Sequence, residues 1–382
     1  MTSRFVLNET SFFGWGCRNE LVEQIKSRGY KRALLVTDEN LLKNEVTDLV
    51  IKLLDKAKLE YDIFSDVKSN PTIKNVKHGL REIRKNHDDY IIAVGGGSVI
   101  DAAKAIGVVF NNSEFKDIKS LEGISKSNNP SVPIIAIPTT SGSASEGTIT
   151  FDITDEDMKS KLVCIDAHSI PVVAIADTEL MSYMPVSVAV ASGMDALTHA
   201  IESYLTKGHN EMTDMYALEA MRIIYNNLEK SIIKDGYAMD QMAIAQYIAG
   251  LGASNAGLGI VHSMAHQLSA LYDTPHGLAN AILLPYVLEY NGDACPDRYK
   301  DIGKAFGLSM DGLDDKEVVE TVVNAIKDLN YRLEIPKHIK EVGAKKDDIS
   351  LLAYKALYDP CTSGNPKKME LKDFEEFFER VL

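Results

Sequence analysis

The chain has 382 residues, of which 45% are hydrophobic and 25% charged. These proportions are typical of globular proteins and exclude a disordered, collagen-like or coiled-coil chain. The length suggests two or three domains, with cores large enough to need no disulfides. The formal net charge of −14 argues against a nucleic-acid partner.

The four cysteines lie far apart and form no CxxC pair, which favours a reduced, cytoplasmic compartment. The N-terminal segment has no basic region followed by an apolar one, so no secretory signal is expected. No apolar run reaches the roughly 18 residues that a membrane-spanning helix needs. We therefore expect a cytoplasmic protein that has no membrane contact.

In the first half of the chain, short β-rich runs alternate with helical patterns. Several runs are continuously apolar, as expected of strands covered on both faces of a parallel sheet. The predicted strands are Arg32–Thr37, Glu60–Phe64, Asp89–Val94, Pro133–Ile137 and Val172–Ala176. The predicted helices are Asn19–Arg28, Leu41–Lys56, Ile73–Asn86 and Val99–Phe110. This alternation predicts an open parallel α/β sheet.

After about Pro185 the β-rich runs stop and only helical patterns remain. The predicted helices are Met215–Lys230, Met239–Ala253, Lys316–Asn330, Ile349–Leu357 and Leu371–Val381. We therefore predict an α/β domain over residues 1–184 and an all-α domain over residues 185–382.

Two loops that follow predicted strands suggest a phosphate-binding site. The first holds Gly96, Gly97 and Ser98, and Ser98 can cap the helix that follows. Glycines let a backbone approach a ligand closely, and a helix N-terminus attracts a pyrophosphate. The loop does not match GxGxxG, so a tight strand–helix turn explains it equally well.

The second loop carries small hydroxylated residues after the strand Pro133–Ile137, among them Thr139, Thr140 and Ser143. Ligands of open α/β sheets bind at the carboxyl ends of the strands. Two such loops in one sheet favour a nucleotide.

Asp38 closes the strand Arg32–Thr37. A carboxylate at the end of an early strand can bind the ribose 2′-hydroxyl and would repel a 2′-phosphate, which predicts NAD rather than NADP. The alternative is an ordinary N-cap of the next helix. The residues alone do not decide between these roles.

The second half concentrates histidines near one aspartate. Asp195 and His199 are spaced i, i+4, which places both on one face of a helix, and His262 and His266 share this spacing. His276 follows at a Pro–His–Gly corner. An aspartate with several imidazoles is a ligand set for Fe²⁺, Zn²⁺, Co²⁺ or Ni²⁺. The alternative is a set of buried histidines bonded to backbone, but apolar neighbours make unshared burial costly and favour a metal.

Several sequence motifs, spread along nearly the whole chain, are informative when they are taken together. They are LNET at 7–10, RGYKRALLVTD at 28–38, NPTI at 70–73, GGGSVIDAAKAIG at 95–107, AIPTTSGSASE at 136–146, GMDALTHAIE at 193–202, GLGIVHSMAH at 257–266, TPHGLANAILLP at 274–285 and CTSGNPK at 361–367. This combination resembles the iron-containing alcohol dehydrogenase family, and within it the lactaldehyde reductase branch. The resemblance implies a dehydroquinate synthase-like architecture, with an N-terminal dinucleotide-binding domain and a C-terminal helical metal-binding domain.

The resemblance also implies roles for single residues. The implied metal ligands are Asp195, His199, His262 and His276, with His266 beside the substrate. The implied cofactor contacts are Asp38, Asn70, Gly97, Ser98, Thr139, Thr140 and Lys161, and Gly96, Asp101 and Ser143 of the same motifs complete the predicted cofactor site. We expect Asp195, His262 and His266 to be the catalytic residues.

The implied reaction is hydride transfer between NAD(H) and a small alcohol or aldehyde, foremost lactaldehyde and 1,2-propanediol. The metal is expected to be Fe²⁺, with Zn²⁺ as the alternative. His266 either relays a proton or only orients a ligand. Branch members are homodimers, and the resemblance implies pairing of the strand around Phe5–Leu7 with the partner subunit.

Some positions depart from the family pattern: Gly147, Thr150, Ala253 and Gln267. If Thr150 and Ala253 line the pocket, it is roomier than that of lactaldehyde reductases. A broader alcohol dehydrogenase acting on 1,3-propanediol or butanol, or a glycerol dehydrogenase-like enzyme, is therefore the alternative. A metal-dependent hydrolase would not need the two phosphate loops, and a non-catalytic nucleotide sensor would be expected to have lost metal ligands.

Overall fold

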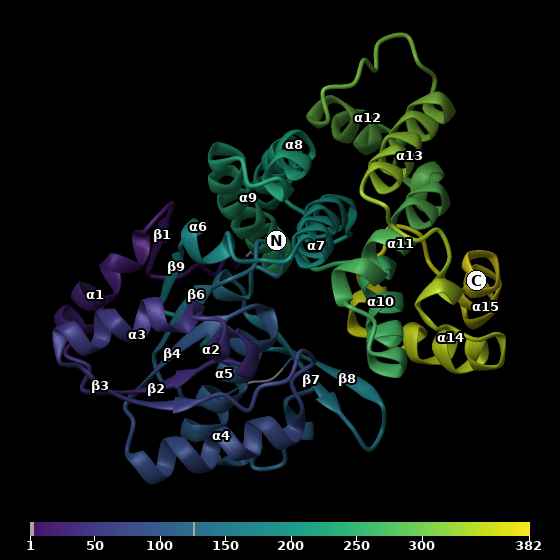
Figure 1. Ribbon diagram of the computed structural model, residues 1–382. Helices are drawn as coiled ribbons and strands as arrows, with labels where there is room; N and C mark the ends of the chain where they lie inside the picture. Colours follow the sequence, from purple (N-terminus) through teal and green to yellow (C-terminus); the bar gives the residue numbers. More distant parts are fainter. Residues whose placement is uncertain (1–3, 125–126) are drawn as a thin grey trace. The chain divides into compact units, whose positions relative to one another are not determined.

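A computed structural model describes residues 4–124 and 127–382, which form two compact units, Met1–Pro185 and Val186–Leu382 (Figure 1). The first unit is an α/β domain and the second is helical, so the predicted fold class is confirmed. Each unit has its own core, and each is described separately below.

The first unit is built on a six-stranded sheet in the order β1-β9-β6-β4-β2-β3, in which all neighbouring strands are parallel. The strands are β1 (Thr10–Phe13), β2 (Arg32–Val36), β3 (Glu60–Phe64), β4 (Tyr90–Gly95), β6 (Ile134–Pro138) and β9 (Val173–Ala176). The five predicted strands are confirmed to within a residue or two. Because β4 and β6 are neighbours, the two predicted phosphate loops, which follow these strands, begin side by side.

Helices cover both faces of this sheet because alternate strand residues enter two different cores. One core joins the sheet to α4 (Ile73–Asn86) and α5 (Gly97–Asn111). The other joins it to α1 (Leu21–Arg28), α3 (Val46–Ala57) and α6 (Thr178–Met181). Burial on both faces explains why the central strands are apolar without alternation.

Three features of this unit differ from the prediction, and the first is β1, which is not among the five predicted strands. The expected helix Leu41–Lys56 is divided into α2 (Glu39–Lys43) and α3, because Glu45 takes a left-handed conformation with φ 62°. A second sheet, β5-β8-β7, was not expected. It consists of β5 (Gly123–Ile124), β7 (Thr150–Asp155) and β8 (Ser160–Ile165). β7 and β8 pair as an antiparallel hairpin, and β7 packs against α5.

The second unit contains no strand and has one continuous apolar core. Its α-helices are α7 (Val186–Leu205), α8 (Glu211–Ile232), α9 (Gly236–Ala256), α10 (Ile260–Tyr272), α11 (His276–Asn291), α12 (Pro296–Ala305), α13 (Asp315–Arg332), α14 (Ile349–Leu357) and α15 (Leu371–Val381). A short 3₁₀ helix, η9, covers Pro360–Gly364. Positive-φ residues divide the helices that carry the histidines: Gly257 precedes α10, and Asp273 ends it.

In the described part of the chain, no single helix is long and apolar enough to cross a membrane. The pair α9 and α10, bent by 104°, reaches that length and composition only when both helices are taken together.

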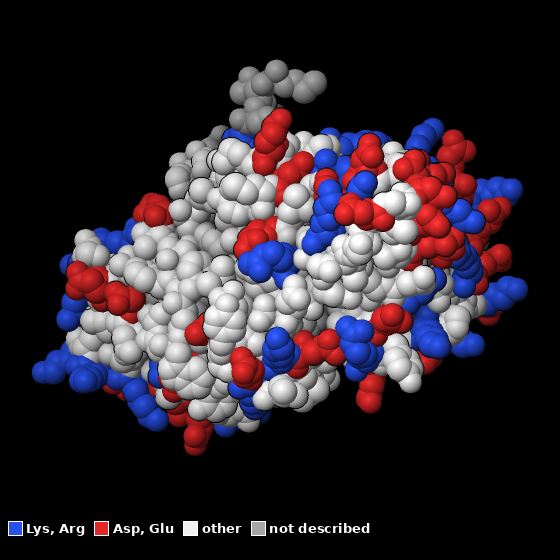
Figure 2. Space-filling model, turned by 90° about the horizontal axis from the view of Figure 1, so that it is seen from above, with Lys and Arg blue, Asp and Glu red and all other residues white. Residues whose placement is uncertain are grey.

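Figure 2 shows acidic and basic side chains mixed on one face of the molecule, with areas of uncharged surface on the same face.

Candidate metal centre and cofactor loops

Three helices of the second unit supply the predicted metal ligands. Asp195 and His199 lie one turn apart on α7, and His262 and His266 lie one turn apart on α10. His276 is the first residue of α11, which Pro275 precedes as N-cap. A close approach of α7 and α11 brings these helices together, because a Cβ on Gly277 would lie 2.0 Å from the carbonyl oxygen of Ala191.

The donor atoms of three predicted ligands converge. One atom each of Asp195, His262 and His276 lies within 4.8 Å of the others. Asp195 Oδ1 is 3.9 Å from His262 Nε2 and 3.7 Å from His276 Nε2. The fourth predicted ligand, His199, has its Nδ1 4.0 Å from Asp195 Oδ1, and its ring lies 4.6 Å from the ring of His262.

The amide of Asn280 lies among these donor atoms. Its Nδ2 is 2.7 Å from Asp195 Oδ1, 3.2 Å from His276 Nε2 and 3.4 Å from His262 Nε2. An amide nitrogen carries two protons, so it cannot satisfy three acceptor atoms at once. Asp195, His262 and Asn280 are buried, and the side chain of His276 is partly exposed. A buried excess of acceptors suits a divalent cation, and this donor set is borderline in softness, as Fe²⁺ and Zn²⁺ prefer.

His266 lies beside this donor group. Its ring stacks on that of His276 with centroids 5.2 Å apart, and its Nδ1 is 2.8 Å from Asp359 Oδ2. Gln267 Nε2 approaches the same Asp359 oxygen at 3.4 Å. His266 thus lies next to the centre while its Nδ1 is held by a carboxylate.

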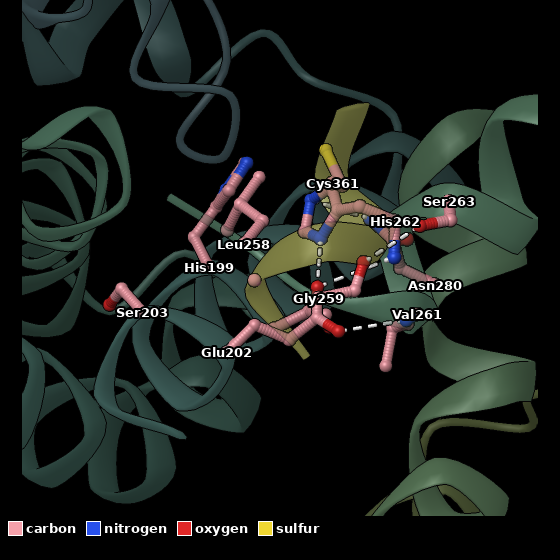
Figure 3. A network of polar contacts seen from close by, with 12 residues as sticks. His199, Glu202, Ser203, Leu258, Gly259, Val261, His262, Ser263, Asn280 and Cys361 are labelled. Carbon is pink, nitrogen blue, oxygen red and sulfur yellow. Dashed lines mark hydrogen bonds and ion pairs between the residues drawn. The ribbon is translucent and has the colours of Figure 1, made fainter. Parts of the chain in front are cut away.

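Sequence reasoning missed three polar residues of this centre, namely Glu202, Asn280 and Asp359. Glu202 lies two turns after Asp195 on α7, and its carboxylate contacts His262 (Figure 3). Asn280 lies one turn after His276. A polar residue inside an otherwise apolar helix could have indicated the first two, whereas Asp359 contacts a histidine 93 residues away and gives no local signal.

In the first unit, the two predicted phosphate loops contact each other. Thr139 N–H donates to the Gly95 carbonyl at 3.0 Å. A Cβ on Gly96 would lie 3.2 Å from Thr140 Cγ2, and one on Gly97 would lie 2.7 Å from Ser143. Only glycine allows this packing at position 97, so the glycines serve the contact between loops as well as any approach to a ligand.

The expected cap of α5 is wrong. The helix begins at Gly97 with Gly96 as N-cap, so Ser98 lies inside the first turn. Its hydroxyl donates instead to the carbonyl of Ser69. This bond ties the start of α5 to the segment that contains Asn70, another predicted cofactor contact.

Asp101 and Lys104 lie three residues apart on α5, and each bonds the chain that follows the second loop. Asp101 accepts from Ser145 Oγ at 2.5 Å and from Asp152 N–H at 3.1 Å. Lys104 is fully buried and donates to Thr148 Oγ1 at 3.0 Å. Burial raises the pKa of Asp101 and lowers the pKa of Lys104. The charge of each residue opposes the shift of the other. Both Asp101 oxygens therefore hold the second loop and β7, and its cofactor contact stays a prediction.

The other two predicted cofactor residues lie apart from these loops in sequence. Asp38 is the N-cap of α2, and its Oδ1 accepts from the N–H groups of Asn40 and Leu41. Lys161 lies on β8 with its Nζ 3.7 Å from Asp152 Oδ2. Their contacts with a cofactor stay predictions.

The comparisons with known proteins agree with one family. Residues 8–178 match the model of iron-containing alcohol dehydrogenase, and residues 189–382 match that of the Fe-containing alcohol dehydrogenase family, C-terminal. The chain is 47% identical to lactaldehyde reductase of Escherichia coli K12 over 378 residues, 99% of both chains. It is 39% identical to 1,3-propanediol dehydrogenase of Citrobacter freundii, over 99% of this chain and 98% of that one.

Solved structures are similar over the full length. A 1,3-propanediol oxidoreductase has a TM-score of 0.96 at 37% identity, and an alcohol dehydrogenase from Oenococcus oeni has 0.96 at 36%, each over 100% of both chains. The chain therefore belongs to the iron-containing alcohol dehydrogenase family, in its lactaldehyde reductase branch, and is an NAD(H)- and metal-dependent alcohol oxidoreductase.

Proposed function

We propose that the chain catalyses the NADH-dependent reduction of lactaldehyde to 1,2-propanediol, and the reverse oxidation, with Fe²⁺ held by Asp195, His199, His262 and His276. The observation that carries the proposal is the convergence of a buried carboxylate and imidazole nitrogens from three helices. The 47% identity to a lactaldehyde reductase supports the substrate.

The protein residues fix the geometry of the reaction. A bound divalent ion supplies Lewis acidity, which polarises a carbonyl and stabilises an alkoxide. Asp195 brings a negative charge to the donor group, and Asn280 restrains that carboxylate by donating to it at 2.7 Å. Glu202 restrains His262 through Nδ1.

The reaction also moves a proton, and His266 is the residue placed to handle it. Asp359 holds His266 at Nδ1, and we assign to the other ring nitrogen, Nε2, the transfer of a proton to or from the substrate oxygen. The alternative is that His266 only orients the neighbouring His276. A His266→Ala variant separates the roles, since a relay would lose about 10²-fold or more in kcat while metal content stays unchanged.

NAD(H) carries the hydride, and the first unit supplies its binding surface. Gly96, Gly97, Thr139, Thr140 and Ser143 belong to the two loops that meet beyond β4 and β6. The N-terminus of α5, which no side chain caps among the described residues, would attract the pyrophosphate. Around these loops, we assign Ser98, Asn70, Asp101 and Lys161 to the same cofactor site, and Asp38 to the adenosine ribose.

A broader substrate range is the second candidate. Ala253 on α9 has a small, buried side chain. If Ala253 borders the substrate, this short side chain leaves room for longer aldehydes. Relatives at 38–39% identity named as 1,3-propanediol dehydrogenases agree with such a range.

The test is NADH oxidation by protein purified without oxygen, stripped of metal and supplied with Fe²⁺ or Zn²⁺. Lactaldehyde is compared with propanal and butanal. Turnover restored by Fe²⁺ that favours lactaldehyde supports the proposal. A preference for butanal would replace lactaldehyde by the broader range, and no turnover with either metal would contradict the proposed site.

Variants locate the activity in the assigned residues. Asp195→Ala and His262→Ala should lose metal and turnover together, because each removes a donor atom. His209→Ala is the control, since His209 is an exposed histidine that contacts Asp214 at 3.2 Å outside the donor group. Loss of metal from the control as well would place the ion elsewhere.

We also propose a homodimer in which residues around Phe5–Leu7 pair with the partner subunit. In the single chain these residues belong to no strand, and β1 begins only at Thr10. Light scattering on the full chain and on a variant lacking residues 1–7 tests the pairing. A dimeric truncated variant would contradict it.

A further inference from the structure

Glu202 is a buried carboxylate that binds the start of a different helix. It lies on α7 with a side chain only 5% exposed, and its oxygens accept from two consecutive N–H groups of α10. Oε1 is 2.8 Å from Val261 N, and Oε2 is 3.3 Å from His262 N. Figure 3 shows the carboxylate between Val261 and the His262 ring.

No residue at the start of α10 provides a side-chain cap for its first N–H groups, and Glu202 provides one instead. The N-cap of α10 is Gly259, which has no side chain to accept from the first N–H groups. A Cβ on residue 259 would lie 2.8 Å from Glu202 Oε1. Gly259 therefore supplies no side-chain cap, and its missing Cβ leaves space for the Glu202 carboxylate to cap α10. The positive end of the helix dipole favours a negative charge at this position.

The same carboxylate fixes the protonation pattern of His262. Oε2 is 2.6 Å from His262 Nδ1, and a carboxylate at this distance requires a proton on that nitrogen. A neutral imidazole with its proton on Nδ1 has its lone pair on Nε2. His262 Nε2 is the atom that faces Asp195 in the donor group.

Glu202 and Asp195 lie seven residues, or two turns, apart on one face of α7. One helix thus carries both the carboxylate donor and the carboxylate that aligns a second donor. We infer that Glu202 is a positioning residue for the metal, which holds His262 in the metal-binding tautomer and sets metal affinity through it. The inference rests on the metal site of the proposed function.

Glu202→Gln is the informative variant. Its amide oxygen can still accept from the α10 N–H groups, so the helix cap is retained in part. Its amide nitrogen is a donor, and if it faces His262 Nδ1 it favours the tautomer with the proton on Nε2, which cannot bind metal. We expect metal affinity to fall about 10- to 100-fold, as for other residues that orient metal-bound histidines.

The measurement is the competition of stripped protein with a chelator for Zn²⁺ and Co²⁺, together with the visible spectrum of the Co²⁺ form. The control is Ser203→Ala, which removes a buried hydroxyl from the adjacent α7 position, where it bonds only the Ala200 carbonyl among the hydrogen bonds described. NADH affinity, read from nucleotide fluorescence, should stay unchanged in both variants.

Three results decide the inference. A weaker metal affinity and an altered Co²⁺ spectrum in Glu202→Gln, but not in Ser203→Ala, support it. Lower thermal stability of the metal-free variant with unchanged metal affinity would overturn it, because Glu202 would then only cap α10. Wild-type protein that binds no metal at all would overturn the proposed function itself.

Discussion

Asp38 can serve as helix cap and as ribose ligand at the same time. Its Oδ1 accepts both N–H groups of α2, and no hydrogen bond within the described residues engages Oδ2. The half-buried carboxylate can therefore accept a hydrogen bond from the ribose 2′-hydroxyl with its second oxygen. Its negative charge would repel a 2′-phosphate. The two roles that the sequence left open are compatible.

We predict that Asp38→Gly raises the ratio of kcat/KM for NADPH to that for NADH by about tenfold or more, which corresponds to ~1.4 kcal/mol. Asp38→Asn is the matched variant, because its amide oxygen keeps the cap while the charge is lost. A rise in both variants would attribute selectivity to charge. An unchanged ratio in both would remove Asp38 from the ribose site.

Asp88 is a buried acid that the reaction does not use. Within residues 4–124 and 127–382 its carboxylate oxygens have no hydrogen-bond partner, and Arg32 Nε lies 3.6 Å from Oδ1. Burial raises the pKa of Asp88 to about 7, with the negative charge of Asp62 adding to the shift and Arg32 opposing it.

This shift predicts a pH dependence of stability. Between about pH 4 and pH 7 the folded chain keeps a proton that the unfolded chain has released, so the free energy of unfolding falls as pH rises through this range. Asp88→Asn should abolish the fall and leave the variant more stable at pH 8, by ~1.4 kcal/mol for each pKa unit removed. Urea unfolding from pH 4 to 8 measures this.

The control for losing one charge is Asp311→Asn, on the exposed segment before α13. Its unfolding curves should keep the wild-type pH dependence. An Asp88→Asn profile parallel to that of the wild type would show that another group causes the dependence.

At the scale of elements, the close approach of α7 and α11 shapes the donor group. A methyl group at Gly277 would lie 2.0 Å from the Ala191 carbonyl and 3.0 Å from Asp195 Cβ. Gly277→Ala must therefore push α11 away from α7 and move His276, its first residue, relative to Asp195. We expect it to lower stability by about 1–3 kcal/mol and to weaken metal binding.

The matched control is Gly236→Ala at the start of α9, where a Cβ meets no atom within 4 Å. Alanine should be neutral or slightly stabilising there. Thermal unfolding with and without metal separates the two effects. Wild-type metal affinity in Gly277→Ala would show that the helices can part without displacing His276.

The elements that the sequence predicted are those whose own pattern decides them. Strands buried on both faces are apolar throughout, and amphipathic helices such as α4, α14 and α15 match their predicted bounds. The hairpin of β7 and β8 was missed because its alternating burial places charged residues in both strands. The break at Glu45 was missed because neither glycine nor proline marks it.

The residues of the metal site also fall into those that a local pattern predicted and those that were missed. The i, i+4 spacing of Asp195 and His199, and of His262 and His266, is readable from single helices and predicted which residues gather. Glu202 and Asp359 act on histidines 60 and 93 residues away. Such contacts depend on helix packing, which no local pattern contains.

At the scale of the whole molecule, the two units have separate cores. The metal donors all belong to Val186–Leu382, and the phosphate loops belong to Met1–Pro185. A ligand that binds only the folded state stabilises the cooperative unit that contains its site, by about 2.7 kcal/mol at a hundredfold excess over Kd. Metal and NADH should therefore protect different parts of the chain.

We predict that Zn²⁺ added to stripped protein slows amide hydrogen exchange chiefly in α7, α10 and α11, whereas NADH slows it chiefly around the loops after β4 and β6. Each effect should persist when the other ligand is absent, since the named metal donors all belong to the second unit and the phosphate loops all belong to the first. Asp195→Ala should lose the metal response and keep the NADH response. Equal protection of both units by either ligand would instead mean that the chain unfolds as one cooperative structure, whose stability the two sites share.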